Sequence, residues 1–137
     1  MKKSIVEAKL KQAIDNLFEN QPNIYDFTDG TGQTEWNLAH HLAYEIHKLF
    51  SAYDCDLDVT KHNYEERRPD IIFHKRNSHD SNFLVVEIKK DGTRRKMEDD
   101  IQKIKNFWFE DRLKYKFGAY INLKSNKTGE IKVIENE

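Results

Sequence analysis

Residues 69–89 read PDIIFHKRNSHDSNFLVVEIK, and this stretch decides the fold. Two apolar runs, 70–74 and 83–89, flank a polar segment at 77–82. Pro69 precedes the first run, and proline is tolerated at the first position of a strand. Short apolar runs on either side of a polar turn are typical of a β-hairpin. The sequence therefore predicts two antiparallel strands, the second of them the most apolar strand of the chain.

Helical spacing of apolar residues frames this hairpin on both sides. Three segments show it: 3–19, 35–50 and 96–113. Alternation or a short apolar run predicts further strands at 55–59, 117–123 and 131–134. Residues 20–34, which contain several Gly, Asn, Asp and Thr, are expected to form a loop. The order ααβββαββ predicts one α/β domain over residues 1–137, with an extra N-terminal helix at about 3–19.

The composition excludes several classes of protein. The 137 residues include 5 Gly, 2 Pro and 1 Cys, and 34% of the side chains are charged. A single cysteine rules out an internal disulfide framework and a zinc site built on several cysteines. The longest apolar runs are about four residues long, so we expect no membrane span, no signal peptide and a soluble, cytoplasmic protein.

The net charge of −1 conceals an uneven distribution. Residues 1–59 contain 5 Lys/Arg against 10 Asp/Glu, whereas residues 60–137 contain 18 against 14. Four basic residues follow the second hairpin strand closely: Lys90, Arg94, Arg95 and Lys96. Local basic clusters can follow a phosphate backbone even when the whole protein is nearly neutral. A solvated charged surface is the alternative interpretation.

The second hairpin strand carries a carboxylate and an ammonium group side by side. Alternation puts Glu87 and Lys89 on the same face, and antiparallel pairing puts Asp70 roughly level with them. Two carboxylates suit Mg²⁺, which takes few protein ligands and keeps several waters. The helix at 35–50 adds Glu35, which lies in the middle of its apolar stripe. The alternatives are a Glu87–Lys89 pair at a strand end and a first-turn Glu35 that interacts with the helix dipole.

Two stretches of this sequence resemble the motifs of the PD-(D/E)XK nuclease superfamily. They are Arg68-Pro69-Asp70-Ile71-Ile72 and Val85-Val86-Glu87-Ile88-Lys89. The resemblance covers residues 34–123, in the order helix with an acid, strand, strand with Pro-Asp, strand with Glu-x-Lys, helix, strand. It implies a restriction-endonuclease-like core, in which helices flank a mixed β-sheet. It also implies an enzyme, expected to be an endonuclease, that hydrolyses DNA phosphodiester bonds with Mg²⁺ or Mn²⁺.

The resemblance implies a role for each matching residue. Asp70 and Glu87 match the metal-binding carboxylates, and the backbone carbonyl of Ile88 matches a further metal ligand. Lys89 matches the lysine that activates the attacking water and stabilises charge on the phosphate. Glu35 matches the first-helix acid that completes the metal shell in many members. No Ser/His/Asp or Cys/His arrangement in the sequence competes as a catalytic centre.

Two alternatives on the same fold stay open. One is a catalytically inactive nucleic-acid-binding or assembly module, because some members keep the fold and lose the chemistry. The other is a Holliday-junction-type resolvase, which would act as a homodimer. DNA is the expected partner, contacted through the basic cluster at Lys90, Arg94, Arg95 and Lys96, and RNA is the alternative partner.

Overall fold

The computed structural model describes residues 1–29, 34–57, 69–78, 80–110 and 112–137. The helices are α1 (Lys3–Asn20), α2 (Ile24–Asp29), α3 (Thr34–Leu49) and α4 (Arg94–Lys103), and α4 continues as a π-helical turn, η1 (Ile104–Trp108). The strands are β1 (Asp54–Leu57), β2 (Ile71–His74), β3 (Leu84–Lys90), β4 (Phe117–Leu123) and β5 (Gly129–Glu135). The α/β class expected from the sequence is confirmed. None of the helices described is long and apolar enough to cross a bilayer.

Five strands form one mixed sheet in the order β1-β2-β3-β4-β5. Strands β2 and β3 pair antiparallel, with Ile71 opposite Val86, so the hairpin expected within 69–89 is confirmed. Strands β3 and β4 pair in parallel, with Glu87 opposite Tyr120. A parallel pair needs a crossover connection, and α4 lies in it. Strands β1 and β5 each pair antiparallel with their neighbour and form the two edges.

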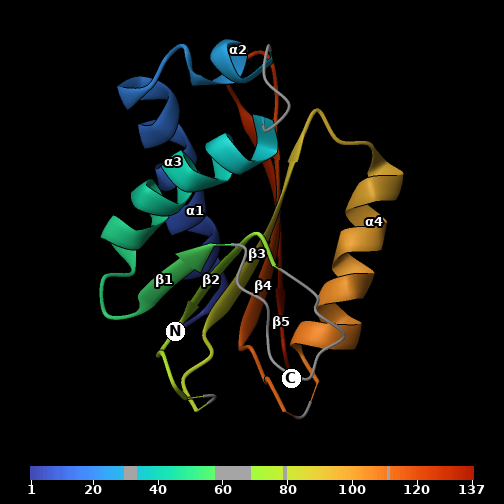
Figure 1. The fold of residues 1–137 in the computed structure, drawn as a ribbon. Helices are drawn as coiled ribbons and strands as arrows, with labels where there is room; N and C mark the ends of the chain where they lie inside the picture. The colour runs from blue at the N-terminus through green and yellow to red at the C-terminus, as the bar shows by residue number, and fades with distance from the viewer. Residues whose placement is uncertain (30–33, 58–68, 79, 111) are drawn as a thin grey trace.

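Figure 1 shows the sheet between two helical layers, with α1 and α3 on one face and α4 on the other. Alternation along β3 divides its side chains between these layers. Val86 and Ile88 belong to the apolar cluster formed with α1 and α3. Val85 belongs to the cluster under α4 and η1, together with Trp108. Glu87 has the same parity as Val85 and therefore faces α4.

Residues 24–29 form a helix where the sequence predicted a loop, so that prediction is wrong there. Ile24 and Tyr25 are buried in the cluster of α1 and α3. The Tyr25 hydroxyl donates to the Asp91 carboxylate, and Lys90 Nζ donates to the Tyr25 carbonyl oxygen at 3.2 Å. These contacts with the end of β3 stabilise a helix of 6 residues, which local propensity alone does not.

The helix expected at 96–113 begins earlier and ends sooner than predicted. Its start is set by Thr93, whose hydroxyl accepts a hydrogen bond from the Lys96 backbone N–H at 3.2 Å. Such an N-cap satisfies one of the free N–H groups of the first turn. At the other end the Trp108 carbonyl accepts the Tyr115 N–H at 3.0 Å, which turns the chain back toward β4.

The strand expected at 55–59 corresponds to β1, and its last two positions lie outside the described residues. Asp56 of this edge strand accepts hydrogen bonds from Arg76 Nε at 3.0 Å and from Arg76 Nη2 at 2.8 Å. His74 Nε2 lies 2.6 Å from the Asp56 carboxylate. The hydrogen bonds from Arg76, and then the one from His74, lower the pKa of Asp56 to about 2, although its burial opposes this. These contacts attach the β2–β3 turn to the sheet edge.

Replacing Asp56 with Asn should lower the free energy of unfolding by about 1 kcal/mol near neutral pH. The pKa of Asp56 is lower in the folded protein, so its stabilisation is present above pH 3.8 and is lost as the pH falls toward 2. Urea unfolding of both proteins at neutral and at acid pH measures the difference. Asp15→Asn, at an exposed position of α1, is the control. Equal stabilities of wild type and Asp56→Asn near neutral pH would contradict this assignment.

Candidate functional site

Asp70 and Glu87 lie next to each other at the point where β2 and β3 separate. The ladder ends at the Ile71–Val86 pair, and the next residues in the same register are Asp70 and Glu87. Beyond that pair the Ile88 N–H donates to Asp70 Oδ2 at 2.6 Å, so a side chain rather than the neighbouring backbone accepts it. This hydrogen bond holds the Asp70 carboxylate against β3, and its charge acts on Glu87. The structure thus brings together two residues that the sequence singled out.

Glu87 is a buried acid with a raised proton affinity. It is 1% exposed, and burial is the largest reason that its pKa rises from 4.5 to about 8. The negative charge of Asp70 raises this pKa further, the cation of Lys103 opposes the rise, and Asp100 adds to it. A carboxylate whose charge is this unfavourable in the protein is stabilised by any cation that reaches it.

Helix α4 supplies two charged residues that face the charges of β3. Lys103 Nζ lies 3.2 Å from Glu87 Oε1, and Lys89 Nζ lies 3.2 Å from Asp100 Oδ2. Asp100 and Lys103 are three positions apart and therefore lie on the same side of the helix. We call Glu87, Lys89, Asp100 and Lys103 the β3–α4 charge clasp. It joins the strand to the helix through two ion pairs. The strand supplies the acid in one pair, and it supplies the lysine in the other.

Asp100 and Lys103 were not found from the sequence. The apolar spacing within 96–113 predicts that Met97, Ile101, Ile104 and Trp108 share the inner face of the helix. In the structure Ile104 and Trp108 are buried as predicted, and Met97 and Ile101 are half-buried. Asp100, which was not part of that stripe, is buried as well. The signal that could have revealed the pair is its i, i+3 spacing of opposite charges, on a helix that crosses over a strand carrying Glu-x-Lys.

Divalent-cation binding fits the donors at this position. Mg²⁺ binds through one or two carboxylates and keeps several waters, and Asp70 and Glu87 supply two. Glu87 Oε1 is buried, and the cation beside it is Lys103 Nζ, at 3.2 Å. Within the described part of the chain, no group of three or more His, Cys, Asp or Glu side chains could hold a metal by itself. The donors therefore suit a hydrated Mg²⁺ or Mn²⁺ better than zinc or calcium, which take more protein ligands.

Glu35 and Ile88 stay predictions as metal ligands. Ile88 is buried in β3 between Glu87 and Lys89, and the donation of its N–H to Asp70 is described above. Glu35 lies in the first turn of α3, and its side chain lies outside the described residues. Helix α3 packs on the face of the sheet opposite to Glu87.

The residues expected to contact DNA divide between two faces of the sheet. Arg94, Arg95 and Lys96 are exposed in the first turn of α4, on the side that the carboxylates face. Lys90 faces the other side, where its Nζ donates to the Tyr25 carbonyl and lies 4.3 Å from the centroid of the Tyr25 ring. The structure therefore places three of the four basic residues on the α4 side of the sheet and leaves Lys90 with α2.

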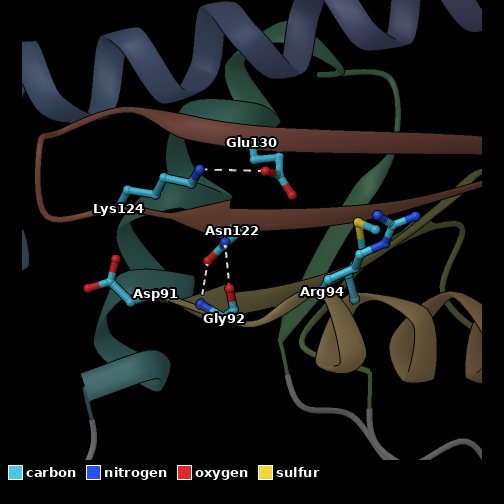
Figure 2. Close-up of a pocket in the computed structure, with 7 residues that line it drawn as sticks. Asp91, Gly92, Arg94, Asn122, Lys124 and Glu130 are labelled. Carbon is cyan, nitrogen blue, oxygen red and sulfur yellow. Dashed lines mark hydrogen bonds and ion pairs between the residues drawn. The ribbon is translucent and has the colours of Figure 1, made fainter.

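A surface hollow of about 400 Å³ lies between the start of α4 and the β4–β5 hairpin (Figure 2). Most of its lining residues are charged or polar: Asp91, Gly92, Arg94, Met97, Asn122, Lys124 and Glu130. Buried Asn122 accepts the Gly92 N–H at 2.7 Å and donates to the Gly92 carbonyl at 3.1 Å. Lys124 and Glu130 pair at 3.5 Å beside this contact.

Gly92 allows the loop after β3 to approach Lys89 closely. A Cβ at this position would lie 2.8 Å from Lys89 Cβ and 2.7 Å from the Tyr120 hydroxyl oxygen. Only glycine fits that space without a shift of its neighbours. The Asn122–Gly92 contact therefore fixes the backbone that follows Lys89. The hollow adjoins Lys89 in this way, and neither Asp70 nor Glu87 lines it.

Other reactive side chains belong to the opposite end of β2. Burial raises the pKa of the Cys55 thiol to about 12, so this thiol is protonated at neutral pH. Cys55 lies opposite Phe73 in the sheet. His74 is 6% exposed and contacts Asp56. Neither residue therefore supplies a nucleophile or a base beside Asp70.

No protein family, curated protein or solved structure matches this chain. The fold and the site alone therefore define its class. It is an α/β chain with a five-stranded mixed sheet and two adjoining carboxylates where two strands separate. The chemistry of this site comes from those carboxylates and from Lys89 and Lys103 beside them.

Proposed function

We propose that this protein is a metal-dependent nuclease, an endonuclease with a restriction-endonuclease-like core, that hydrolyses DNA phosphodiester bonds. One observation carries the proposal: Asp70 and Glu87 lie next to each other, beside Lys89, at the point where β2 and β3 separate. The succession of α3, three antiparallel strands, α4 and the parallel strand β4 supports it. The same succession is implied by the resemblance of the two motifs to the PD-(D/E)XK superfamily.

In this proposal Asp70 and Glu87 hold Mg²⁺ or Mn²⁺, with the Ile88 carbonyl and Glu35 as further ligands. When bound, the ion polarises the phosphate and lowers the pKa of a bound water. The Ile88 N–H orients the Asp70 carboxylate through their hydrogen bond of 2.6 Å. Burial among apolar side chains excludes bulk water from Glu87, which strengthens its interaction with any cation.

The lysine and arginine side chains around the carboxylates bind the substrate. Lys89 stabilises the negative charge that develops on the phosphate in the transition state. Arg94, Arg95 and Lys96 contact the DNA backbone from the exposed first turn of α4. Arg94 also lines the hollow that adjoins Lys89 through Gly92, so the path of the phosphate backbone runs along this hollow.

A catalytically inactive nucleic-acid-binding module is the second candidate. The charge clasp favours it, because Glu87 and Lys89 already have ion-pair partners within the chain. Buried charges that pair with one another can join a helix to a strand without any catalytic role. The basic first turn of α4 would then bind nucleic acid without cleavage.

The purified protein should cleave DNA in the presence of Mg²⁺ or Mn²⁺ and not in EDTA. The substrates are linear, nicked, branched and single-stranded DNA, and RNA is tested as well. Cleavage is measured on denaturing gels. Binding of the same substrates is followed separately by fluorescence anisotropy. Asp70→Asn, purified in parallel, removes one metal-binding charge and should be inactive. Its residual cleavage measures any contaminating nuclease.

Each outcome of this assay points to one function. Binding without cleavage in any metal would favour the inactive module over the enzyme. Paired incisions in branched DNA by a dimer would identify a resolvase, and cleavage of RNA alone would change the substrate. Failure to bind or to cleave any of these nucleic acids would contradict both candidates.

A further inference from the structure

Lys103 places a positive charge on the buried carboxylate of the proposed metal site. Its Nζ lies 3.2 Å from Glu87 Oε1, and this oxygen is buried. The charges of Asp70 and Asp100 both act on Glu87, so the ammonium group of Lys103 faces a concentration of negative charge. Lys103 therefore meets the same electrostatic need that a divalent cation would meet.

The Lys103 side chain can leave this position more easily than Glu87 can. It is 30% exposed, whereas the Glu87 side chain is 2% exposed. Lysine carries a strongly hydrated charge on a flexible stem, so its ammonium group regains water when it turns outward. Lys103 is also the last residue of α4 before the π-helical turn η1, and such turns are frequent at functional sites.

The two lysines of the charge clasp are not equivalent. Lys89 Nζ lies 3.2 Å from Asp100 Oδ2, so it pairs with the acid of the helix. Lys103 pairs with the acid of the strand, which is a proposed metal ligand. A cation that arrives at Glu87 therefore competes with Lys103 and leaves the Lys89–Asp100 pair in place.

We infer that Lys103 is the resident counter-cation of Glu87 and gives up this position when a divalent cation binds, so that it raises the metal concentration needed to fill the site. The inference rests on the proposed function, because it takes Asp70 and Glu87 as the metal ligands. It makes Lys103 the cation that offsets the negative charges around Glu87 when no metal is bound. It assigns no contact between Lys103 and the substrate.

Lys103→Met removes the charge and keeps a long, unbranched side chain. This variant should fill with Mg²⁺ at an about tenfold lower concentration than the wild type, because Mg²⁺ no longer has to displace an ammonium group from Glu87. The full-length protein is titrated with MgCl₂ above pH 8, where Glu87 is ionised, and the rise in melting temperature gives the midpoint. Lys105→Met, at an exposed position of η1, is the matched control and should titrate like the wild type.

A second measurement is made without metal. In EDTA, Lys103→Met should melt at a lower temperature than the wild type, and the deficit should shrink as Mg²⁺ is added. Lys103→Arg keeps the positive charge and should restore a midpoint close to that of the wild type. If Lys103→Met does not fold, Lys103→Gln, which retains a hydrogen-bond donor, replaces it in both titrations.

The outcomes separate this inference from the proposed function. An unchanged or higher Mg²⁺ midpoint in Lys103→Met, while the wild type binds Mg²⁺, would overturn the inference and leave the metal site standing. A complete lack of Mg²⁺ and Mn²⁺ binding by both proteins would overturn the metal site and the inference together. A lower midpoint in Lys105→Met as well would mean that general surface charge, rather than the Lys103–Glu87 pair, controls metal binding.

Discussion

A Lys89→Met protein should cleave DNA about 10²–10³-fold more slowly than the wild type at saturating Mg²⁺. Lys89 shares a face of β3 with Glu87, and its side chain is 22% exposed, so its charge is partly withdrawn from water. That charge acts most strongly on negative charge that develops in the transition state, so kcat should fall more than DNA affinity. Single-turnover rates at saturating protein measure the loss. Mg²⁺ binding, followed by thermal unfolding, should be almost unchanged.

The ion pair with Asp100 requires its own control. Lys89→Met removes the positive charge that faces the buried Asp100 carboxylate, which lowers stability whether or not Lys89 acts in catalysis. The double variant Lys89→Met/Asp100→Asn removes both charges and should be nearer to the wild type in stability, yet as slow as the single variant. Lys105→Met should cleave at the wild-type rate. Full activity of Lys89→Met would show that Lys89 serves only as the partner of Asp100.

The central sheet could be predicted from the sequence because its signals are local. Two apolar runs around a polar turn specify a hairpin, and alternation specifies which side chains share a face. The strand expected at 117–123 has the same bounds as β4. The helix α2 could not be predicted, because its stability comes from contacts of Tyr25 with Asp91 and Lys90, far along the chain.

Only part of the candidate site could be predicted from the sequence. The nearness of Asp70 to Glu87 follows from the hairpin register, since the two residues continue the Ile71–Val86 pairing. The contribution of α4 does not follow in this way, because it depends on how the helix is rotated against the sheet. Apolar spacing predicted the buried positions of Ile104 and Trp108, but it gave no sign that Asp100 is buried too. The partners of Asp100 and Lys103 lie on β3, and spacing within the helix cannot reveal them.

Glu87→Gln should make the metal-free protein more stable above pH 8, by up to about 5 kcal/mol. The pKa of Glu87 rises from 4.5 to about 8 on folding, so between these values the folded protein holds a proton that the unfolded chain has released. Wild-type stability should therefore fall as the pH rises through this window. The glutamine side chain of the variant cannot ionise, so the variant should lack that part of the fall. Urea unfolding in EDTA at a series of pH values measures both curves.

The difference between the two curves isolates the contribution of Glu87 to the pH dependence of stability from the contributions of the other groups. At about pH 5 both proteins should be similarly stable, because Glu87 is then protonated in the folded state. Glu98→Gln, at an exposed position of α4, should follow the wild type throughout. Addition of Mg²⁺ above pH 8 should stabilise the wild type and not Glu87→Gln, because only the ionised carboxylate binds the ion. A variant that is less stable than the wild type above pH 8 in EDTA would show that the Lys103–Glu87 pair outweighs the burial of the charge. Glu87 would then be a structural ion-pair residue, and the case for a metal held by Asp70 and Glu87 would lose its electrostatic basis.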